Sequence, residues 1–405
     1  MITAAGCGSA ADVRPQPPAA GRGVAATGLA ATPPALGAAD TAFGLDLLGA
    51  WCRQDPAANI VLSPESLATG LGMAYLGARG ATARAMAAVL HLPATGAALQ
   101  AGLRARTGEL RALDGPGVTV AGSDRVWASP SLPPLRSYLT AVAGSYGATL
   151  GRAPLLSDPA QATRQIDAAI SAATRGHIPQ LLTPGSLNGI AWVLTDALYL
   201  DAAWASPFRA SQTRPGPFTT ASGRQATVSF LHRGGVRSAT SGGWTAVRLP
   251  YRGGKLAMTA LLPDSGSGGC PALPAATLAA VTAALAGRGS GLTGVALPKV
   301  SLRSSASLDA LLTGLGMGIA FGDSADFTGL SPQACCIGLV QHAATLSVAE
   351  KGTVGSAATA VGVTPTAVSV PASQVVFDRP YLLLVSATGT GEPLFLARVA
   401  DPATG

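Results

Sequence analysis

The stretch AEKGTVGSAATAVGVTPTAVSV, from Ala349 to Val370, is unusually poor in large side chains. After Lys351 it contains only Gly, Ala, Ser, Thr, Val and one Pro, with no charge and no aromatic ring. Such a run suits a flexible linker, but it also suits an extended strand whose side chains take little room on either face. Strongly apolar segments lie on both sides of it, so its role depends on the chain around it.

Strand patterns dominate the second half of the chain. Short apolar and β-branched runs alternate there with turns that contain Gly, Pro or Ser, which is typical of antiparallel strands. A Gly-rich turn at Ala387–Gly391 joins the last two runs. The predicted strands are Gln225–Leu231, Thr245–Leu249, Leu256–Leu262, Gly294–Ser301, Tyr381–Ser386 and Leu394–Val399.

Helical patterns dominate the first half. Apolar residues share one face of Asp40–Arg53, and Ser63 with Pro64 provides the cap and first position of a nearly all-apolar helix. Helices early and strands late, without an internal repeat, predict an α+β fold in one domain. Further predicted elements are helices at Ala81–Leu90 and Asp158–Thr174, and strands at Asn59–Leu62, Val118–Ala128 and Trp192–Leu200.

Residues 1–37 differ from the rest of the chain. They are rich in Pro and small polar residues, which predicts a disordered tail before a domain at residues 38–403. The opening MITAAGC, Met1–Cys7, resembles the end of a bacterial lipoprotein signal with Cys7 as the lipidated residue, although the charged and apolar regions of a signal peptide are missing. We therefore expect an exported, extracellular or cell-surface protein, with the tail as a tether or a remnant of the signal.

The composition excludes several classes of function. The formal net charge is +7, but arginines such as Arg104, Arg106 and Arg111 are scattered and aromatic residues are few, which predicts a solvated basic surface and no nucleic-acid site. No run of about 18 apolar residues occurs, so no transmembrane helix is predicted. A G-x-S-x-G elbow, a P-loop and paired-histidine spacings are absent, so the sequence predicts no catalytic site, no metal and no cofactor.

The cysteines show no metal-binding or redox spacing, because no C-x-x-C occurs. Two of them are adjacent in the sequence, which is an awkward geometry for a disulfide. We therefore predict that the cysteines are mostly small buried apolar side chains. They are Cys7, Cys52, Cys270, Cys335 and Cys336.

Eight short motifs follow one another along the chain. They are NIVLSPES at Asn59–Ser66, LGARGAT at Leu76–Thr82, RGHIPQLL at Arg175–Leu182, LTDALYLDAAWASPF at Leu194–Phe208, LPKVSL at Leu297–Leu302, EKGT at Glu350–Thr353, FDRPYL at Phe377–Leu382 and LFLARVADP at Leu394–Pro402. Each motif alone is modest evidence. Together and in this order they resemble the serpin family over roughly Ala38 to Pro402.

The resemblance implies a single serpin-like domain with a large central mixed sheet, further smaller sheets, about eight or nine helices and an exposed reactive-centre loop. In this family a protease cleaves the loop, which then enters the large sheet as an extra strand. The sequence fits this use, because the alternate residues from Thr353 onward are all small. The expected hinge residues are Glu350, Gly352, Thr353, Gly355, Ala357 and Thr359.

Two further sets of residues follow from the resemblance. Lys299 and Glu350 match the ion pair at the end of the sheet where insertion begins. A polar cluster beneath the sheet governs its opening, and a carboxylate stands there where the family has Asn. Because a nearby negative charge favours protonated imidazole, we expect Asp196 to raise the pKa of His342. The residues of the cluster are Ser63, Ser66, Asp196 and His342.

The resemblance also places the bond that a protease would cut. Counting from Glu350 gives Thr366–Ala367, whereas counting back from Phe377 gives Pro365–Thr366. The first is preferred, because Pro before the cut suits few serine proteases. The absence of Lys and Arg between Gly352 and Phe377 favours elastase-like or subtilisin-like targets over trypsin-like ones.

The function that the resemblance implies is inhibition of a serine endopeptidase by a suicide mechanism. The cleaved loop would trap the protease as an acyl-enzyme, so the chain would act as a monomer with no enzymatic activity of its own. The alternative is a non-inhibitory serpin that serves as a protease substrate, a carrier or a chaperone. The bias of Arg over Lys, with abundant Ala and Gly, favours a bacterial member.

Overall fold

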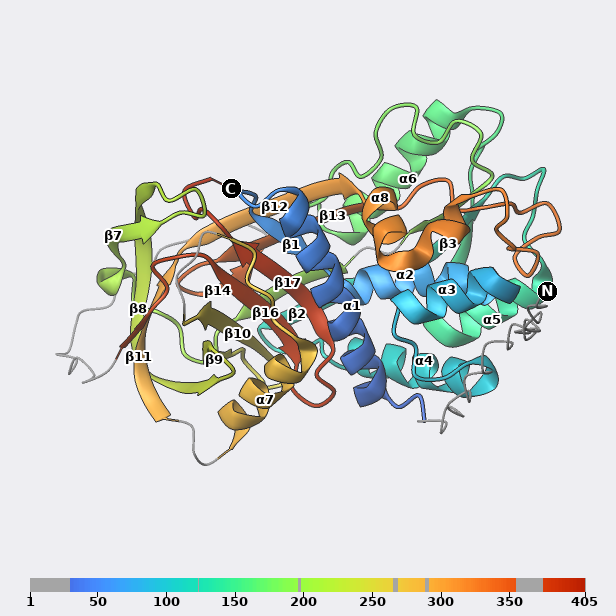
Figure 1. The fold of residues 1–405 in the computed structure, drawn as a ribbon. Coiled ribbons are helices and arrows are strands. Elements are labelled where there is room, and N and C mark those ends of the chain that lie inside the picture. The colour runs from blue at the N-terminus through green and yellow to red at the C-terminus, as the bar shows by residue number, and fades with distance from the viewer. Residues whose placement is uncertain are drawn as a thin grey trace, which may run out of the picture.

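The computed structural model describes residues 30–122, 124–195, 198–264, 269–287, 291–354 and 374–404. Within these ranges the chain forms eight α-helices and three sheets, the largest of which is mixed. The predicted α+β fold is therefore confirmed. Figure 1 shows most of the strands gathered at one end of the molecule and α2 to α5 at the other, with α1 running between them.

Helix starts follow local sequence signals. The Thr32 side chain accepts a hydrogen bond from the amide of Ala35, and Pro33 occupies the first turn of α1. Asp158 caps α6 in the same way before Pro159. The helices are α1 (Pro33–Gln54), α2 (Pro64–Gly77), α3 (Gly80–Val89), α4 (Gly96–Arg111), α5 (Arg136–Tyr146), α6 (Pro159–Ala173), α7 (Ala275–Ala286) and α8 (Asp309–Leu312).

The largest sheet has nine strands in the order β1-β17-β16-β10-β9-β8-β11-β15, and β7 pairs with β8 beside this path. β15 runs parallel to β11, whereas neighbours such as β16 and β17 run antiparallel. Its strands are β1 (Ile60–Leu62), β7 (Arg214–Thr219), β8 (Gln225–Ser241), β9 (Trp244–Pro250), β10 (Leu256–Pro263), β11 (Gly291–Pro298), β15 (Gln374–Val376), β16 (Tyr381–Ala387) and β17 (Pro393–Val399).

Two smaller sheets complete the strand framework. The five-stranded sheet has the order β12-β13-β14-β6-β2, and the three-stranded sheet has the order β4-β3-β5. They are neighbours along the chain, because β3 follows β2 and β6 follows β5 within a few residues. The strands are β2 (Val118–Gly122), β3 (Arg125–Ala128), β4 (Thr149–Arg152), β5 (Trp192–Thr195), β6 (Leu198–Ala203), β12 (Val300–Ser307), β13 (Gln341–Val348) and β14 (Gly352–Val354).

Successive side chains of the nine-stranded sheet belong to two different cores. Leu383 of β16 is buried in a cluster with Leu346 of the five-stranded sheet. Its neighbour Leu382 is buried in a second cluster with Phe43 of α1. Because strand side chains alternate between faces, the five-stranded sheet covers one face of the large sheet and the helices cover the other.

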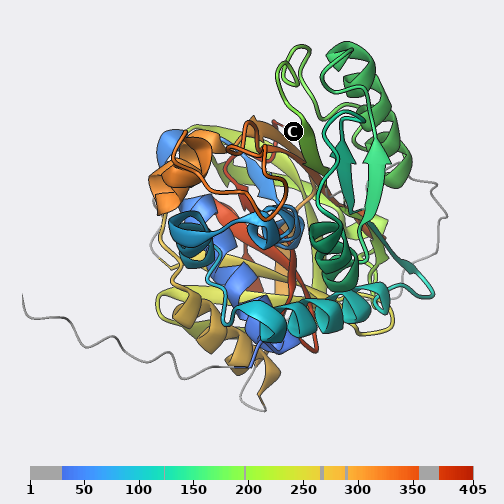
Figure 2. The ribbon, with the colours of Figure 1, turned by 90° about the vertical axis from the view of Figure 1, so that its right-hand side faces the viewer.

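Helix α6 covers the three-stranded sheet. Ile166 and Ile170, one helical turn apart, are buried against Trp127 of β3. In Figure 2 this helix, drawn in green, lies beside the strands of that sheet. The periodicity of the apolar residues at Asp158–Thr174 predicts this packing face correctly.

The folded chain begins earlier than the sequence predicts. Helix α1 starts at Pro33 instead of Asp40, and Leu36 is buried ahead of the boundary expected at Ala38. The sequence pattern misses this turn because Pro in the first turn is compatible with both a helix and an extended tail. Residues 1–29, which include Cys7, lie outside the described residues.

One predicted strand is divided between two sheets. Val118–Ala128 covers β2 and β3, and Trp192–Leu200 covers β5 and β6, with residues 123 and 196–197 between them outside the described ranges. Gly294–Ser301 is divided because the chain leaves the nine-stranded sheet after Pro298 and enters the five-stranded sheet at Val300. β11 is buried at six successive positions, whereas β12 alternates between buried and exposed positions, because its outer face is open to solvent.

Candidate functional site

The two edges of β13 are paired very differently. All eight of its residues are in register with β12, from Gln341 opposite Ser307 to Val348 opposite Val300. On the other edge Val348 alone pairs, with Thr353 of β14. Among the described residues, the other seven positions of β13 have no strand partner on that side. A long strand edge is therefore open next to the start of the predicted loop.

Strand β14 lies between β13 and β6 in the strand order, and it is so short that it pairs with only one end of each of them. Its residues pair antiparallel with β6, and Thr353 lies opposite Ala202. Gly352 approaches β6 so closely that an added Cβ would lie 2.2 Å from the carbonyl oxygen of Ala202. A larger residue would push the two backbones apart, so this position requires Gly. The start of the predicted loop thus lies in the sheet that contains β13 and β6.

The turn before β14 is held by side chains from three other segments. Lys299 Nζ lies 3.2 Å from Glu350 Oε2, and the Thr213 hydroxyl donates to Glu350 Oε1 at 3.0 Å. Burial acts to raise the pKa of Glu350, but hydrogen bonds from the backbone, Lys299 and Thr213 outweigh it, so the pKa is lowered. Lys299 reaches this point because it occupies the crossing from β11 to β12. The predicted pair is thus in contact, and its role in insertion stays a prediction.

Aromatic side chains also support the turn before β14, and little in the sequence predicts these contacts. The Trp204 indole N–H donates to the carbonyl oxygen of Ala349 at 2.9 Å. Trp204 stacks on Tyr251 with ring centroids 4.5 Å apart, and the Tyr251 hydroxyl is 2.5 Å from the hydroxyl of buried Thr353. Trp204 falls inside a quoted motif, whereas Tyr251 follows β9 and carries no local signal.

The polar cluster lies where α2 begins beside β13. The Ser63 hydroxyl accepts a hydrogen bond from the Ser66 amide as the cap of α2, and the Ser63 amide donates to His342 Nε2 at 3.4 Å. His342 is buried, and burial lowers its pKa to about 4. The expectation that its pKa is raised is therefore wrong: desolvation disfavours the charged ring. Asp196, its expected partner, lies outside the described residues.

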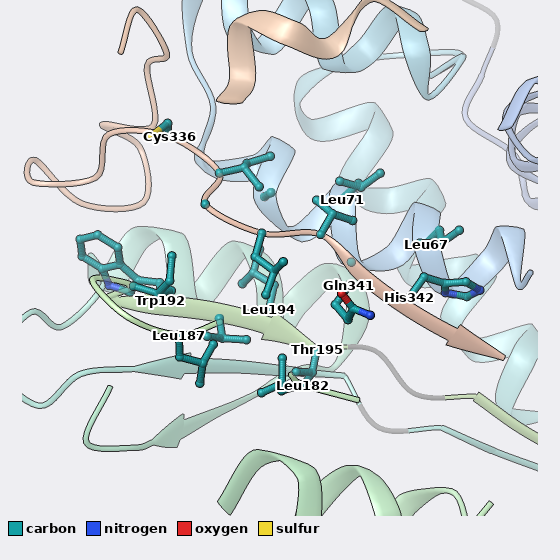
Figure 3. A pocket seen from close by; sticks show the side chains of 18 of the residues that line it. Leu67, Leu71, Leu182, Leu187, Trp192, Leu194, Thr195, Cys336, Gln341 and His342 are labelled. Carbon is teal, nitrogen blue, oxygen red and sulfur yellow. The ribbon is translucent and has the colours of Figure 1, made fainter. Parts of the chain in front are cut away.

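An apolar cavity of about 150 Å³ extends from this cluster between α2, β5 and the segment that leads into β13, of which Gln341 and His342 are part of the lining. Figure 3 shows Leu67 and Leu71 of α2 above it, Trp192 and Leu194 of β5 beside it, and Gln341 and His342 at the start of β13. Its walls are mostly aliphatic, so chain that filled it would exchange water for apolar contacts. The space next to β13 is suited to small side chains.

The remaining predicted loop positions cannot be placed. The hinge positions beyond β14 and both alternatives for the cleaved bond belong to residues 355–373, outside the described ranges. These positions are Gly355, Ala357, Thr359, Pro365, Thr366 and Ala367.

The cysteines differ from their prediction. Cys52 of α1 and Cys270, in the segment before α7, form a disulfide that joins positions 218 residues apart. Cys335 and Cys336 are free and exposed, not buried. Neither result has a sequence signal, because the pairing depends on how α1 and the chain before α7 pack against each other.

Comparison with known proteins agrees with this geometry. The family model described as "Serpin (serine protease inhibitor)" matches residues 38–402. The chain therefore belongs to the serpin family, whose members are described as inhibitors of serine proteases.

Relatives and solved structures cover nearly the whole chain. A leukocyte elastase inhibitor of Bos taurus is 29% identical over 91% of this chain and 99% of its own. A serpin-like protein of Thermococcus kodakarensis is 31% identical over 86% of this chain and 82% of its own length. Uncleaved ovalbumin has a TM-score of 0.78 at 22% identity, covering 91% of this chain and 100% of its own. Native tengpin, a thermophilic serpin, has a TM-score of 0.78 at 22% identity, covering 90% of this chain and 93% of its own.

Proposed function

We propose that this serpin is a single-use covalent inhibitor of a serine endopeptidase and that it acts as a monomer without a cofactor. The observation that carries the proposal is the position of β14. It occupies only the first step between β13 and β6, while seven further positions of β13 have no strand partner on that side among the described residues, and an apolar cavity lies at the first two of them. A cleaved loop could continue β14 directly along that edge.

The proposed reaction uses the nucleophile of the target. The protease serine oxygen attacks the carbonyl carbon of Thr366 and forms an ester, while the carbon–nitrogen bond to Ala367 breaks. The nitrogen of Ala367 takes its proton from the general acid of the protease and leaves as a new amino terminus. About fifteen inserted residues at roughly 3.3 Å each would carry the bound enzyme on the order of 50 Å.

Insertion would be strongly favourable. Each new ladder hydrogen bond contributes about 0.5–1.5 kcal/mol net, and the cavity lining adds apolar contact. The uncleaved chain is then a kinetically trapped state, stable only because an intact loop cannot reach the full length of the edge. Small side chains on both faces of the loop keep the barrier to insertion low.

We propose elastase-like or subtilisin-like proteases as targets. The loop sequence has no Lys or Arg, and its residues near the predicted cut are small. The name of the bovine relative, leukocyte elastase inhibitor, supports the same class of target.

We also propose that the protein is exported. The Cys52–Cys270 disulfide is the supporting observation, because structural disulfides persist mainly in oxidising compartments. Lipidation of Cys7 would then retain the protein at the cell surface. Among the described residues, no helix is both long and apolar enough to span a membrane.

Incubation with subtilisin and with elastase tests the proposal. We expect an SDS-stable complex whose mass is the sum of the protease and the chain cut at Thr366, together with a released peptide that begins at Ala367. Trypsin is the matched control, and we expect it to form no complex at the loop. Cleaved chain without any complex would instead identify a non-inhibitory serpin that serves as a substrate.

A further inference from the structure

Four charged side chains lie buried where three helices meet a turn of the nine-stranded sheet. Asp40 belongs to α1, Glu65 to α2, Arg106 to α4, and Glu392 to the turn before β17. Their side chains are only 1–6% exposed. The prediction that the scattered arginines lie on a solvated surface is therefore wrong for Arg106. The proposed inhibitory mechanism makes no use of this cluster.

Arg106 is the centre of the cluster. Its Nη1 donates to Asp40 Oδ2 and lies 3.8 Å from Glu392 Oε1. Its Nη2 donates to the Thr69 hydroxyl at 2.8 Å and lies 4.0 Å from Glu65 Oε1. The Thr69 hydroxyl donates in turn to Glu65 at 3.0 Å. One guanidinium thus connects three helices and the turn.

The charges of the cluster do not balance if every group is ionised. Three carboxylates would then surround one guanidinium, and a net buried charge is costly. The neighbouring titratable groups do not correct this, since Tyr146 of α5 and Asp124 before β3 are both acids. Lys255 lines a nearby cavity, but its ammonium donates to the carbonyl oxygen of Ala112. In the described part of the chain, no three acidic, His or Cys side chains converge closely enough to hold a metal ion.

Of the four charged groups, Glu392 is the one least stabilised by hydrogen bonds. Neither of its carboxylate oxygens accepts a hydrogen bond from a donor group among the described residues, and the neighbour within hydrogen-bond reach is the Asp40 carboxyl, itself an acid. An ionised carboxylate can only accept hydrogen bonds, whereas a protonated carboxyl can donate one. The turn cannot move away to reach water, because α1 packs tightly on it: a Cβ on Gly37 would lie 2.9 Å from the Thr390 carbonyl oxygen and 3.0 Å from the Glu392 nitrogen.

We propose that this cluster is a buried proton-binding site in which the Glu392 carboxyl keeps its proton in neutral solution and donates it to the Asp40 carboxylate. The bound proton replaces the missing positive charge. It also allows the turn to stay attached to α1 and α4. Loss of the proton would place two adjacent carboxylates in the same dry space and loosen this junction.

The electrostatic environment supports the proposal. Burial, and then the charge of Asp40, raise the pKa of Glu392 well above its usual value, although Arg106 acts in the opposite direction. Burial also raises the pKa of Asp40. It raises the pKa of Glu65 to about 7, against the lowering effect of Arg106.

Solvent can reach the site from one side. A cavity of about 270 Å³ lies between the end of α4 and the β16–β17 turn, and Arg106 and Glu392 form part of its lining. Water in this cavity would exchange protons with Glu392 while the rest of the cluster stays packed. The exposed Glu109 lines the same cavity and provides a matched control, since it shares α4 with Arg106 but not the burial.

The sign of the pH effect follows from the raised pKa. The folded protein holds a proton on Glu392 that the unfolded chain has released, so stability falls as pH rises toward the pKa of the folded state. One extra bound proton changes the unfolding equilibrium constant by about tenfold per pH unit. His342 does not contribute above about pH 6.5, because burial lowers its pKa to about 4.

Urea unfolding between about pH 6.5 and about pH 8.5 tests the proposal. For the unmodified protein and for Glu109→Gln, we expect the unfolding constant to rise by up to about tenfold per pH unit. In Glu392→Gln, whose amide mimics the protonated carboxyl, we expect a clearly weaker dependence, because only the smaller contribution of Glu65, whose pKa is raised to about 7, remains in this range. An identical pH slope in Glu392→Gln and Glu109→Gln would overturn the proposal.

Infrared spectroscopy of the unmodified protein provides a second test that needs no folded variant. At neutral pH we expect the carbonyl band of a protonated carboxylic acid, which weakens as the pH is raised and unfolding begins. A folded protein at neutral pH without that band would contradict the proposal whatever the variants show.

Discussion

Among the described residues, β13 is paired along the whole of one edge and almost unpaired along the other. Toward β12 it has eight residue pairs in register, whereas toward β14 it has one. Every position of β13 is paired on the edge toward β12. Alternate side chains of the strand pack in the core that the five-stranded and nine-stranded sheets share. The open edge adjoins a cavity and a polar cluster instead. Further strand pairing along the open edge would therefore stabilise the folded chain, and the following four predictions test this.

Cleavage near Thr366 should have the largest effect, because it lets the loop complete the open edge. About ten new hydrogen bonds at 0.5–1.5 kcal/mol each would stabilise the chain by roughly 5–15 kcal/mol. At about 2 °C per kcal/mol for a chain of this size, the thermal midpoint should rise by roughly 10–30 °C. Thermal scans of intact and nicked protein measure this. A midpoint that is unchanged or lower after nicking would mean that the open edge is not filled.

Thr353→Arg should displace β14 from its position at the start of the open edge. Thr353 is buried between β13 and β6, and an unpaired buried charge there costs on the order of several kcal/mol. We expect the variant to be cut without forming a complex, so that the number of inhibitor molecules consumed per protease molecule rises at least about tenfold, because each 1.4 kcal/mol of added barrier is a factor of ten.

Thr353→Ser is the matched control, because it keeps a hydroxyl within reach of Tyr251. We expect near-normal complex formation from this variant. Equal stoichiometries for the Arg and Ser variants would show that Thr353 does not need to stay buried during inhibition.

Acidification should weaken the fold through His342, which lies on β13. Its pKa is about 4 in the folded protein and about 6.5 when unfolded, so the unfolded chain binds a proton first as the pH falls. The corresponding stability is complete above about pH 6.5 and is lost toward pH 4, to a total of about 3 kcal/mol. Urea unfolding of the unmodified protein and His342→Gln measures the difference, and parallel acid limbs would mean that His342 is not desolvated.

Lys299→Ala should have the smallest effect. The Lys299–Glu350 pair anchors the turn before β14, but the Lys299 side chain is 48% exposed, so solvent screens the attraction. Pairs of this kind contribute about 0–1 kcal/mol, and the thermal midpoint should fall by no more than about 2 °C. The rate of complex formation with the protease provides the more sensitive measurement. A severe loss of stability would show that the turn depends on this single contact.

Much of the fold could be predicted from local signals. The cap at Ser63, the helix at Asp158–Thr174 and the strands near the C-terminus occur as expected, because hydrophobic periodicity and capping act within a few residues. The resemblance predicts a hinge from Glu350 onward; the described residues of this segment lie next to the end of β13, and their role as a hinge stays a prediction. The sequence pattern misses the split at Lys299, because the predicted strand runs through Pro298 and Lys299, the two residues that mark the change of sheet.

Some site properties depended on neighbours far away in the sequence. The sequence predicts a protonated His342, but its surroundings in the fold favour the neutral ring. The Cys52–Cys270 bond and the support of Thr353 by Tyr251 likewise join residues more than a hundred positions apart. Such pairs leave no periodic or spacing signal in a single sequence.

The sequence by itself determined the α+β class, the order of the elements and the small-residue character of the segment that begins at Glu350. These properties rest on side-chain size, periodicity and capping, which are local. Only the tertiary structure decided that, among the described residues, one edge of β13 is almost unpaired, that burial lowers the pKa of His342 and that Arg106 lies buried among three carboxyl groups. Strand pairing, desolvation and buried charge arise when distant segments remove each other from water, so their outcome is fixed by packing and not by any one stretch of chain.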